Sequence, residues 1–450
     1  MTALASPITA QEAGPVEKRL PGHYVVTTFV VTFASALLLG VSPAMAVPGI
    51  LAGIFLLVAK VVVTPIIPRV AFLALLFVLY ALISAIMFDG IRSLGVSGPV
   101  AWLGGEGRIF IYYWPFIFLT VALYHHTANV ESRLETALLW LTIFAFLVIV
   151  AQRSGVAALY SSHHAAGAVM TSLVVFNYFR YQNHKSLWAL IFLGIAMAGL
   201  LGTGSRASLM AVILGIVIQQ MIGVRIIQVL KFVLLVPIFM VGMSIAYPDQ
   251  YERLSRTFQV NPMTVITTNF DRAWQADPPL ESSEAWALSS YADKQGQANL
   301  AIRGLLWARG VAEGFKSPIF GTGFGRYNDM GREFNDTLPL VAVVTDASFL
   351  NASAHTSHNS FIMIFTELGL IGVALIGGMF VIIIRTALRV LRHPNVRPNA
   401  KMWAGITLGC TVTLMLISIT QHGFGAPIYG LTLMQLIAIG YCVSAREIRA

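Results

Sequence analysis

Two histidines, His355 and His358, lie at the end of the longest polar segment of the chain, and Asn359 follows the second of them. Imidazole titrates near neutral pH, so either side chain is a candidate general base. The apolar run 361–384 begins directly after this motif. The sequence therefore predicts an imidazole at the N-terminal end of a membrane helix, where polar and apolar surroundings meet.

An arginine marks the start of another apolar run. Arg206 follows the turn-forming residues 202–205 and precedes the run 207–222. A cation in the first turn of a helix opposes the helix dipole, so Arg206 is expected to lie beside a bound anion, with Ser205 as the N-cap. A lipid headgroup or a loop carbonyl is the alternative partner for a lone interfacial arginine.

A third candidate, Arg303, lies among apolar residues of a predicted helix at 297–315. Burying an unpaired charge is costly, so Arg303 is expected to point at a partner. The secondary candidates are Arg108, His163, His164, Arg326 and Glu367. Ordinary interfacial or turn contacts explain the first four more simply. Glu367, a carboxylate inside a predicted membrane helix, is either functional or paired with a neighbouring arginine.

The sequence offers no other evident reactive centre. It has no nucleophile triad, no carboxylate pair in a glycosidase-like setting and no metal-ligand spacing. Cys410 and Cys442 lie inside apolar runs and are predicted to pack, and the glycine-rich stretch 321–325 lacks the surroundings of a dinucleotide-binding motif. Histidine with arginines suits removal of a proton from an acceptor hydroxyl while a phosphate leaving group is neutralised, without a metal or another cofactor.

Composition places this chemistry in a membrane. Hydrophobic residues make up 57% of the chain and charged residues 11%, against about 25% charged residues in soluble domains. Expected transmembrane helices lie at 24–39, 47–59, 70–88, 109–124, 134–151, 165–181, 187–203, 207–222, 226–246, 361–384, 402–420 and 427–444. The predicted fold is an all-α polytopic membrane protein with about twelve transmembrane helices.

The distribution of Lys and Arg predicts the orientation of these helices. With the N-terminus in the cytoplasm, most basic residues outside the long polar segment fall in cytoplasmic connections. The short outer connections hold only Arg92, Arg108, Arg153 and Arg206. The net charge of +9 therefore follows from topology and requires no nucleic-acid partner. Residues 44–46 resemble a signal-peptidase site, so cleavage of the first span is an alternative that leaves the remaining topology unchanged.

This topology divides the chain into four parts. Residues 1–23 form a cytoplasmic N-terminus, 24–246 the first nine transmembrane helices, 247–360 an outer loop domain, and 361–450 the last three helices. The outer segment mixes acidic and basic residues as a solvated domain does. The histidines and arginines singled out above are thereby all predicted to lie at the outer face.

Three motifs follow one another along the chain. His358, Asn359, Gly369 and Gly372 match the pattern His, then Asn, Ser or Gln, nine residues, Gly, two residues, and Gly, Thr or Tyr. The other two are the Gly-Ser-Arg-Ala turn at 204–207, and Arg303 followed by Leu306-Trp307, Pro318 and Gly321-Thr322-Gly323. Together they resemble the bacterial O-antigen ligases and their relatives with a Wzy-type C-terminal domain. The resemblance covers about residues 187–375 by motif and the whole chain by topology.

The resemblance implies a GT-C-like glycosyltransferase of the bacterial inner membrane, with its active site and the loop domain 247–360 in the periplasm. Such an enzyme moves a glycan from undecaprenyl diphosphate to lipid A-core oligosaccharide, by inversion and without a metal. By this resemblance His358 would be the base that activates the acceptor hydroxyl, and Arg206 and Arg303 would bind the diphosphate. The glycines at 369 and 372 are expected to allow close packing in the tenth helix, and not to take part in the chemistry.

Two alternatives stay open. O-antigen polymerases and protein O-oligosaccharyltransferases share the domain and the donor but use other acceptors, and only the late position of the long loop favours a ligase. A lipid-glycan transporter is the alternative from a different class. Transporters usually place polar sites and broken helices near the midplane, whereas the charges here are expected at the outer boundary.

Overall fold

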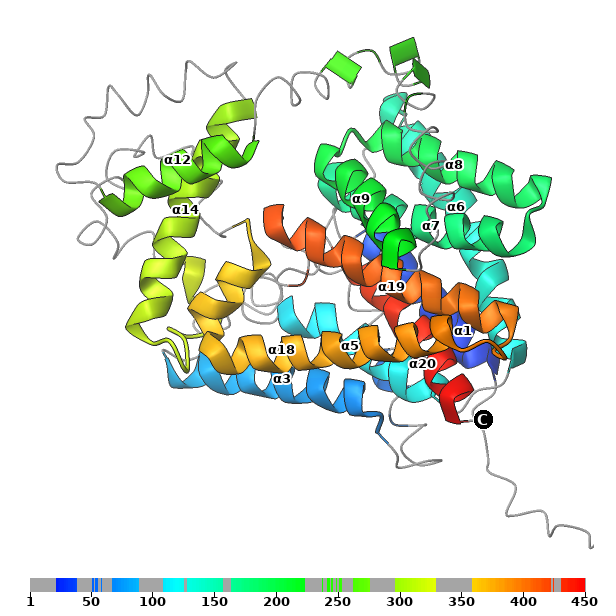
Figure 1. Ribbon diagram of the computed structural model, residues 1–450, viewed down its shortest axis with the longest axis horizontal. Helices are drawn as coiled ribbons and strands as arrows, with labels where there is room; N and C mark the ends of the chain where they lie inside the picture. The colour runs from blue at the N-terminus through cyan, green and yellow to red at the C-terminus, as the bar shows by residue number, and fades with distance from the viewer. Residues whose placement is uncertain are drawn as a thin grey trace, which may run out of the picture.

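The computed structural model describes residues 22–38, 67–88, 108–124, 128–156, 163–222, 262–275, 296–328, 358–421 and 430–449, with Phe424 and scattered positions in 51–58 and 237–252. Every secondary-structure element in these described ranges is a helix (Figure 1). Those long and apolar enough to cross a membrane are α3 (Arg69–Met87), α6 (Ala128–Arg153), α18 (Ser360–Arg392), α19 (Pro398–Thr420) and α20 (Leu431–Arg449). The chain is a multi-pass membrane protein.

Five more helices complete the described bundle. They are α1 (Gly22–Leu38), α5 (Arg108–Leu123), α7 (His163–His184), α8 (Leu187–Thr203) and α9 (Arg206–Ile222). The loop segment contributes α12 (Pro262–Gln275), α14 (Gly296–Lys316) and the short 3-10 helix η2 (Arg326–Asn328). The spans expected at 47–59 and 226–246 lie largely outside the described residues. The total of twelve spans therefore stays a prediction.

Helix α7 lies at the centre of the bundle. Every residue from Ala165 to Phe179 is buried, as expected for a helix surrounded by other helices. Gly405 and Gly409 of α19 leave room for the Phe179 ring, because a Cβ at either glycine would lie within 2.9 Å of it. Asn177 donates a hydrogen bond to Thr142 of α6 at 3.1 Å. These contacts fix α7, and with it the histidine pair in its first turn.

The chain breaks between α8 and α9, as the sequence predicts. Gly204 ends α8 with a φ of 69°, a left-handed conformation that glycine adopts without strain. Ser205 then occupies the N-cap position of α9, since its carbonyl accepts the Leu209 N–H at 3.1 Å. Arg153 Nε donates to the Gly202 carbonyl at 2.6 Å, so a cation satisfies the C-terminal end of α8.

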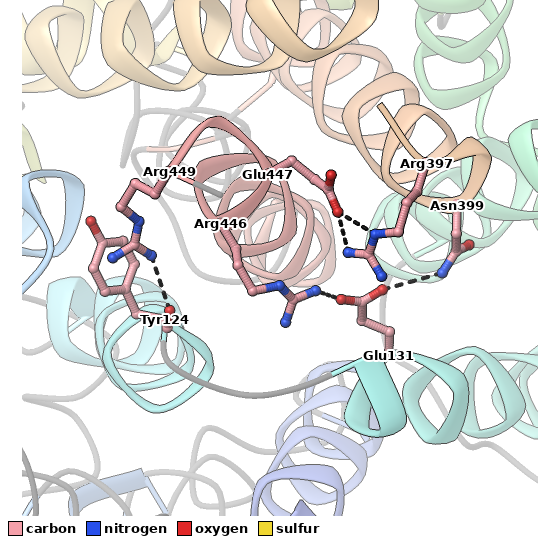
Figure 2. Close-up of polar contacts among 7 residues, drawn as sticks. All are labelled: Tyr124, Glu131, Arg397, Asn399, Arg446, Glu447 and Arg449. Carbon is pink, nitrogen blue, oxygen red and sulfur yellow. Dashed lines mark hydrogen bonds and ion pairs between the residues drawn. The ribbon is translucent and has the colours of Figure 1, made fainter. Parts of the chain in front are cut away.

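A polar network closes the opposite end of the bundle (Figure 2). It joins the end of α5 and the starts of α6 and α19 to the end of α20, through Tyr124, Glu131, Arg397, Asn399, Arg446, Glu447 and Arg449. Arg446 pairs with the buried carboxylate of Glu131, which also accepts from Asn399 Nδ2 at 3.2 Å. The Arg449 guanidinium lies 3.9 Å from the centroid of the Tyr124 ring. This is the end predicted to face the cytoplasm, and both carboxylates of the network are paired with arginines, Glu131 with Arg446 and Glu447 with Arg397.

Helix α18 is not one regular helix. Gly369 interrupts it with a φ of 62° and a ψ of −161°, and the piece before the glycine bends sharply against the rest (Figure 1). The span expected at 361–384 is therefore broken at Gly369, and the close packing expected at this glycine is confirmed, because a Cβ there would lie 2.4 Å from the Ile319 carbonyl oxygen. The helix breaks because another segment inserts its backbone at this point.

The loop that follows α14 replaces the hydrogen bonds lost at the break. A regular helix would join the N–H of residue 370 to the carbonyl of 366, and that of 371 to 367. The four bonds formed instead, donor first, are Leu370 N to Pro318 O (2.8 Å), Ile371 N to Ile319 O (3.3 Å), Thr322 N to Thr366 O (2.9 Å) and Gly323 N to Glu367 O (3.1 Å). The Leu368 carbonyl accepts from the Tyr80 hydroxyl of α3 at 3.2 Å. These bonds replace those that the helix loses at the break, as an apolar environment requires.

Replacing Gly369 with alanine is expected to destabilise the protein by about 2 kcal/mol or more, since the positive φ and the insertion both exclude a side chain. A Cβ there would lie 2.4 Å from the Ile319 carbonyl oxygen. Thermal unfolding of the purified protein in detergent measures the effect. Gly377→Ala on the same helix is the matched control, because no atom lies within 4 Å of its Cβ position. Equal unfolding temperatures for the two variants would contradict this account.

Candidate functional site

Five basic side chains from four elements converge at the end of the bundle opposite the polar network. They are His163 and His164 in the first turn of α7, Arg206 in the first turn of α9, Arg303 on α14, and His358 just before α18. Burial lowers the pKa of His164 to about 3, and the positive charges of the other four residues lower it further. These five residues are called the cationic cluster below. Their charges act on one another although the chain separates them widely.

Close approach of α7 and α9 brings the histidine pair to Arg206. A Cβ on Gly167 would lie 2.5 Å from Ser205 Cβ, so only glycine allows this contact. His164 Nδ1 lies 3.3 Å from Ser205 Oγ, and Ser205 Oγ donates to Ser208 Oγ at 2.8 Å. The Ser205 hydroxyl therefore ties the N-cap of α9 to His164.

The backbone places His358 in an unusual conformation. Its φ is 49°, which few residues other than glycine adopt. The next residue, Asn359, is the N-cap of α18, and its side-chain oxygen accepts from the N–H groups of Phe361 and Ile362 at 2.9 and 3.2 Å. The Asn of the motif therefore fixes the start of the helix, and the conformation of the preceding residue sets the direction of the imidazole.

The connection between α19 and α20 holds the same turn from the other side. Ser360 Oγ donates to the Gln421 carbonyl at 3.4 Å and accepts from the Phe424 N–H at 3.3 Å. The Phe424 carbonyl in turn accepts from the Tyr113 hydroxyl of α5 at 3.1 Å. His358 is thus anchored to α5 and α19, as well as to its own helix.

Helix α14 carries Arg303 into the cluster by packing on the first piece of α18, while α12 packs on α14 (Figure 1). Thr366 Oγ1 donates to the Gly310 carbonyl at 2.6 Å, and Tyr327 donates to the Leu306 carbonyl at 2.6 Å. The helix predicted at 297–315 is confirmed. Its contact with the bundle could not be read from the sequence.

Electrostatics in the cluster favour a neutral imidazole and a bound anion. Burial, followed by the charge of Arg303, lowers the pKa of His358 to about 4. The His358 imidazole is therefore uncharged at neutral pH and able to accept a proton. Burial, then the charge of Arg206, lowers the pKa of Arg303 to about 10. Two arginines that repel each other in a desolvated place gain most from an anion between them.

The other predicted site residues have different places. Glu367 is buried, and its Oε1 accepts the Tyr327 N–H at 3.2 Å, so it helps to hold the loop at the break in α18. Arg326 begins η2 and is not among the charges that shift the pKa of His164, Arg303 or His358. Arg108 begins α5. His355 lies outside the described residues.

Gly167 and Ser208 support the cluster but escaped the sequence-based prediction. Both act on Ser205, as the distances above show. A glycine one turn after a histidine pair and a serine three residues after an N-cap are weak signals without knowledge of which helices meet. Within the described residues, no group of three or more His, Cys, Asp or Glu side chains has the arrangement of a metal site.

The fold and the cluster define a polytopic membrane protein that gathers imidazoles and arginines at one end of its helix bundle. A comparison with protein families adds the particular family. The family model described as O-antigen ligase matches residues 188–377, a stretch that contains Arg206, Arg303 and His358. The recognition made from the motifs is thereby confirmed. A comparison with curated proteins gave no match.

The matched domain indicates the activity at a coarse level. Proteins with this domain are transferases of the glycosyltransferase type that act on lipid-linked glycans at a membrane. The multi-pass architecture agrees with that environment.

Proposed function

We propose that the protein is an O-antigen ligase of the bacterial inner membrane, with its cationic cluster at the periplasmic face. It transfers a glycan from undecaprenyl diphosphate to lipid A-core oligosaccharide, with inversion at the anomeric carbon and without a metal ion. The observation that carries this proposal is the convergence of a neutral His358 with Arg206 and Arg303.

In this mechanism, His358 takes the proton of the acceptor hydroxyl as its oxygen attacks the anomeric carbon of the glycan. The bond from that carbon to the diphosphate oxygen breaks, and undecaprenyl diphosphate leaves with the electron pair. Arg206 and Arg303 bind the diphosphate and stabilise the charge that develops on it. The imidazolium then loses its proton to solvent and becomes ready for another turnover.

A transporter would use a broken helix to hold its substrate at exposed backbone groups. Helix α18 does contain a break, at Gly369. The loop backbone of residues 318–323 bonds to the N–H groups of residues 370 and 371 and to the carbonyls of residues 366 and 367. These four backbone groups are therefore not open to a ligand. The break therefore supports docking of the loop domain, and this favours an enzyme over a transporter.

Purified protein reconstituted with lipid-linked glycan and lipid A-core tests the proposal. We expect core-linked glycan and free undecaprenyl diphosphate to form in equal amounts, in the presence of EDTA. Loss of product with EDTA would overturn the metal-free mechanism. Elongation of the donor glycan with no transfer to core would identify a polymerase, and glycan attached to protein would identify an oligosaccharyltransferase.

A further inference from the structure

Three large apolar side chains at the end of α14 lie on the surface of the loop segment. Phe315, Ile319 and Phe320 are 63%, 53% and 55% exposed. The sequence places Phe315 on the apolar face of a helix outside the membrane, together with Leu306, which is 4% exposed. An aromatic cluster of this kind is unusual on a surface that faces water.

The docked loop backbone holds these side chains in place. The Phe320 carbonyl accepts from the Tyr80 hydroxyl at 2.9 Å, and the Phe315 ring meets the Phe365 ring edge-on with centroids 5.7 Å apart. Pro318 and Ile319 are fixed by the bonds to α18 described above. The three side chains are therefore exposed because the contacts of this segment with α3 and α18 hold them at the surface.

The hydrogen bond between Tyr80 and Phe320 also places Phe320 at a known height along α3. Tyr80 lies seven residues before Met87, the last residue of this candidate span, so it lies roughly 10 Å inside the end of the helix. Phe320 is therefore level with the interior of α3, beside a lipid-facing stripe. The exposed residues of that stripe are Leu79, Ile83, Ile86 and Met87.

Much of the loop backbone is hydrogen-bonded, which favours residence in hydrocarbon, where unbonded polar groups are costly. The carbonyls of residues 318, 319 and 320 accept hydrogen bonds from residues 370, 371 and 80. The N–H groups of Gly321, Thr322 and Gly323 donate to residues 317, 366 and 367. Leu370, at the break in α18, is also more than half exposed and extends the apolar surface.

We propose that residues 315–320 insert into the bilayer leaflet on the side of the cationic cluster, where Phe315, Ile319 and Phe320 contact lipid acyl chains. The occupant is lipid because the patch continues the lipid-facing surface of α3 at the same depth. Helix α14 is then an interfacial helix with a membrane-anchored C-terminal end. Arg303, on the same helix, is held at a fixed height above the bilayer. The inference does not depend on the reaction proposed above.

Quenching of a fluorophore in reconstituted protein tests the insertion. Phe320→Cys and Ile319→Cys, labelled with an environment-sensitive dye in phosphatidylcholine vesicles, are compared with Thr268→Cys on the exposed face of α12. The native Cys410 and Cys442 are 0% and 3% exposed, and wild-type protein treated with the same dye verifies that neither is labelled. We expect nitroxide-bearing lipid to quench positions 319 and 320 several-fold more than 268, and aqueous iodide to show the reverse order.

Either of two results would overturn the insertion. Quenching of positions 319 and 320 by iodide as strongly as 268 would show that the patch faces water. Protection of both positions from both quenchers would show that protein covers them, either a second copy of the chain or another partner. Unfolding temperatures matching the wild type, measured for each labelled variant, exclude misfolding as the cause of any result.

Discussion

Replacing His358 with alanine is expected to lower the rate of glycan transfer by about 10²–10⁴-fold, the usual contribution of a positioned general base. The neutral imidazole in the cationic cluster is the group that would accept the proton of the acceptor. Binding of the donor should change little, because Arg206 and Arg303 remain. In the native host, the variant should leave lipid A-core bare and accumulate lipid-linked glycan, as seen by electrophoresis of lipopolysaccharide.

A second substitution separates chemistry from folding. Alanine is strained at the φ of 49° that His358 adopts, whereas asparagine tolerates this region. His358→Asn should therefore lose activity as fully as His358→Ala while retaining the wild-type unfolding temperature. His393→Ala, in an exposed position at the far end of α18, is the control and should stay active. Full activity of His358→Asn would show that His358 is not the general base.

The pH profile carries a further signature of the same residue. The pKa of His358 in the ligand-free protein is about 4, below its ordinary value of 6.5. The acid limb of the pH profile of kcat/KM should therefore lie well below pH 6.5. A bound diphosphate favours the protonated imidazole, so the acid limb of kcat should lie at a higher pH than that of kcat/KM. The same shift acts on stability, since the unfolded chain binds more protons between these two values. The contribution of His358 is complete above pH 6.5 and is lost as the pH falls toward 4.

Replacing Arg303 with glutamine is expected to lower transfer by about 10²–10³-fold, the loss seen when one charge-stabilising donor is removed from an active site. Stability of the ligand-free protein should be unchanged or higher, because Arg303 is desolvated and lies near the like charge of Arg206. Thermal unfolding with and without undecaprenyl diphosphate measures both effects. The stabilisation that the ligand gives to the wild type should disappear in the variant.

Two further variants sharpen this test. Arg303→Lys keeps the charge but lacks the planar fork that binds phosphate oxygens in pairs, so it should recover only part of the activity. Arg389→Gln, an exposed arginine at the opposite end of α18, should leave transfer and ligand stabilisation intact. Undiminished stabilisation of Arg303→Gln by undecaprenyl diphosphate would contradict the assignment of Arg303 to the diphosphate.

The sequence by itself determined the class of the protein and the family. Apolar runs indicate membrane helices because the hydrocarbon core sets a minimum length, and the Gly204-Ser205 break followed from local turn chemistry. Local preference also predicted α14 and the N-cap position of Ser205. The motifs around Arg206, Arg303 and His358 were sufficient to recognise the O-antigen ligase family, because motif residues keep their order along the chain.

Only the tertiary structure decided how these residues meet. The sequence predicts that Gly369 allows close packing. The structure shows that the segment packed there is the backbone of residues 318–323, which replaces the helix bonds, a pairing between segments that no local pattern encodes. Phe315 is predicted to lie on the apolar face of a helix outside the membrane, and it is 63% exposed next to Phe365 of α18. The depressed pKa of His358 has the same origin, because burial and the charge of a distant arginine exist only once the helices have packed.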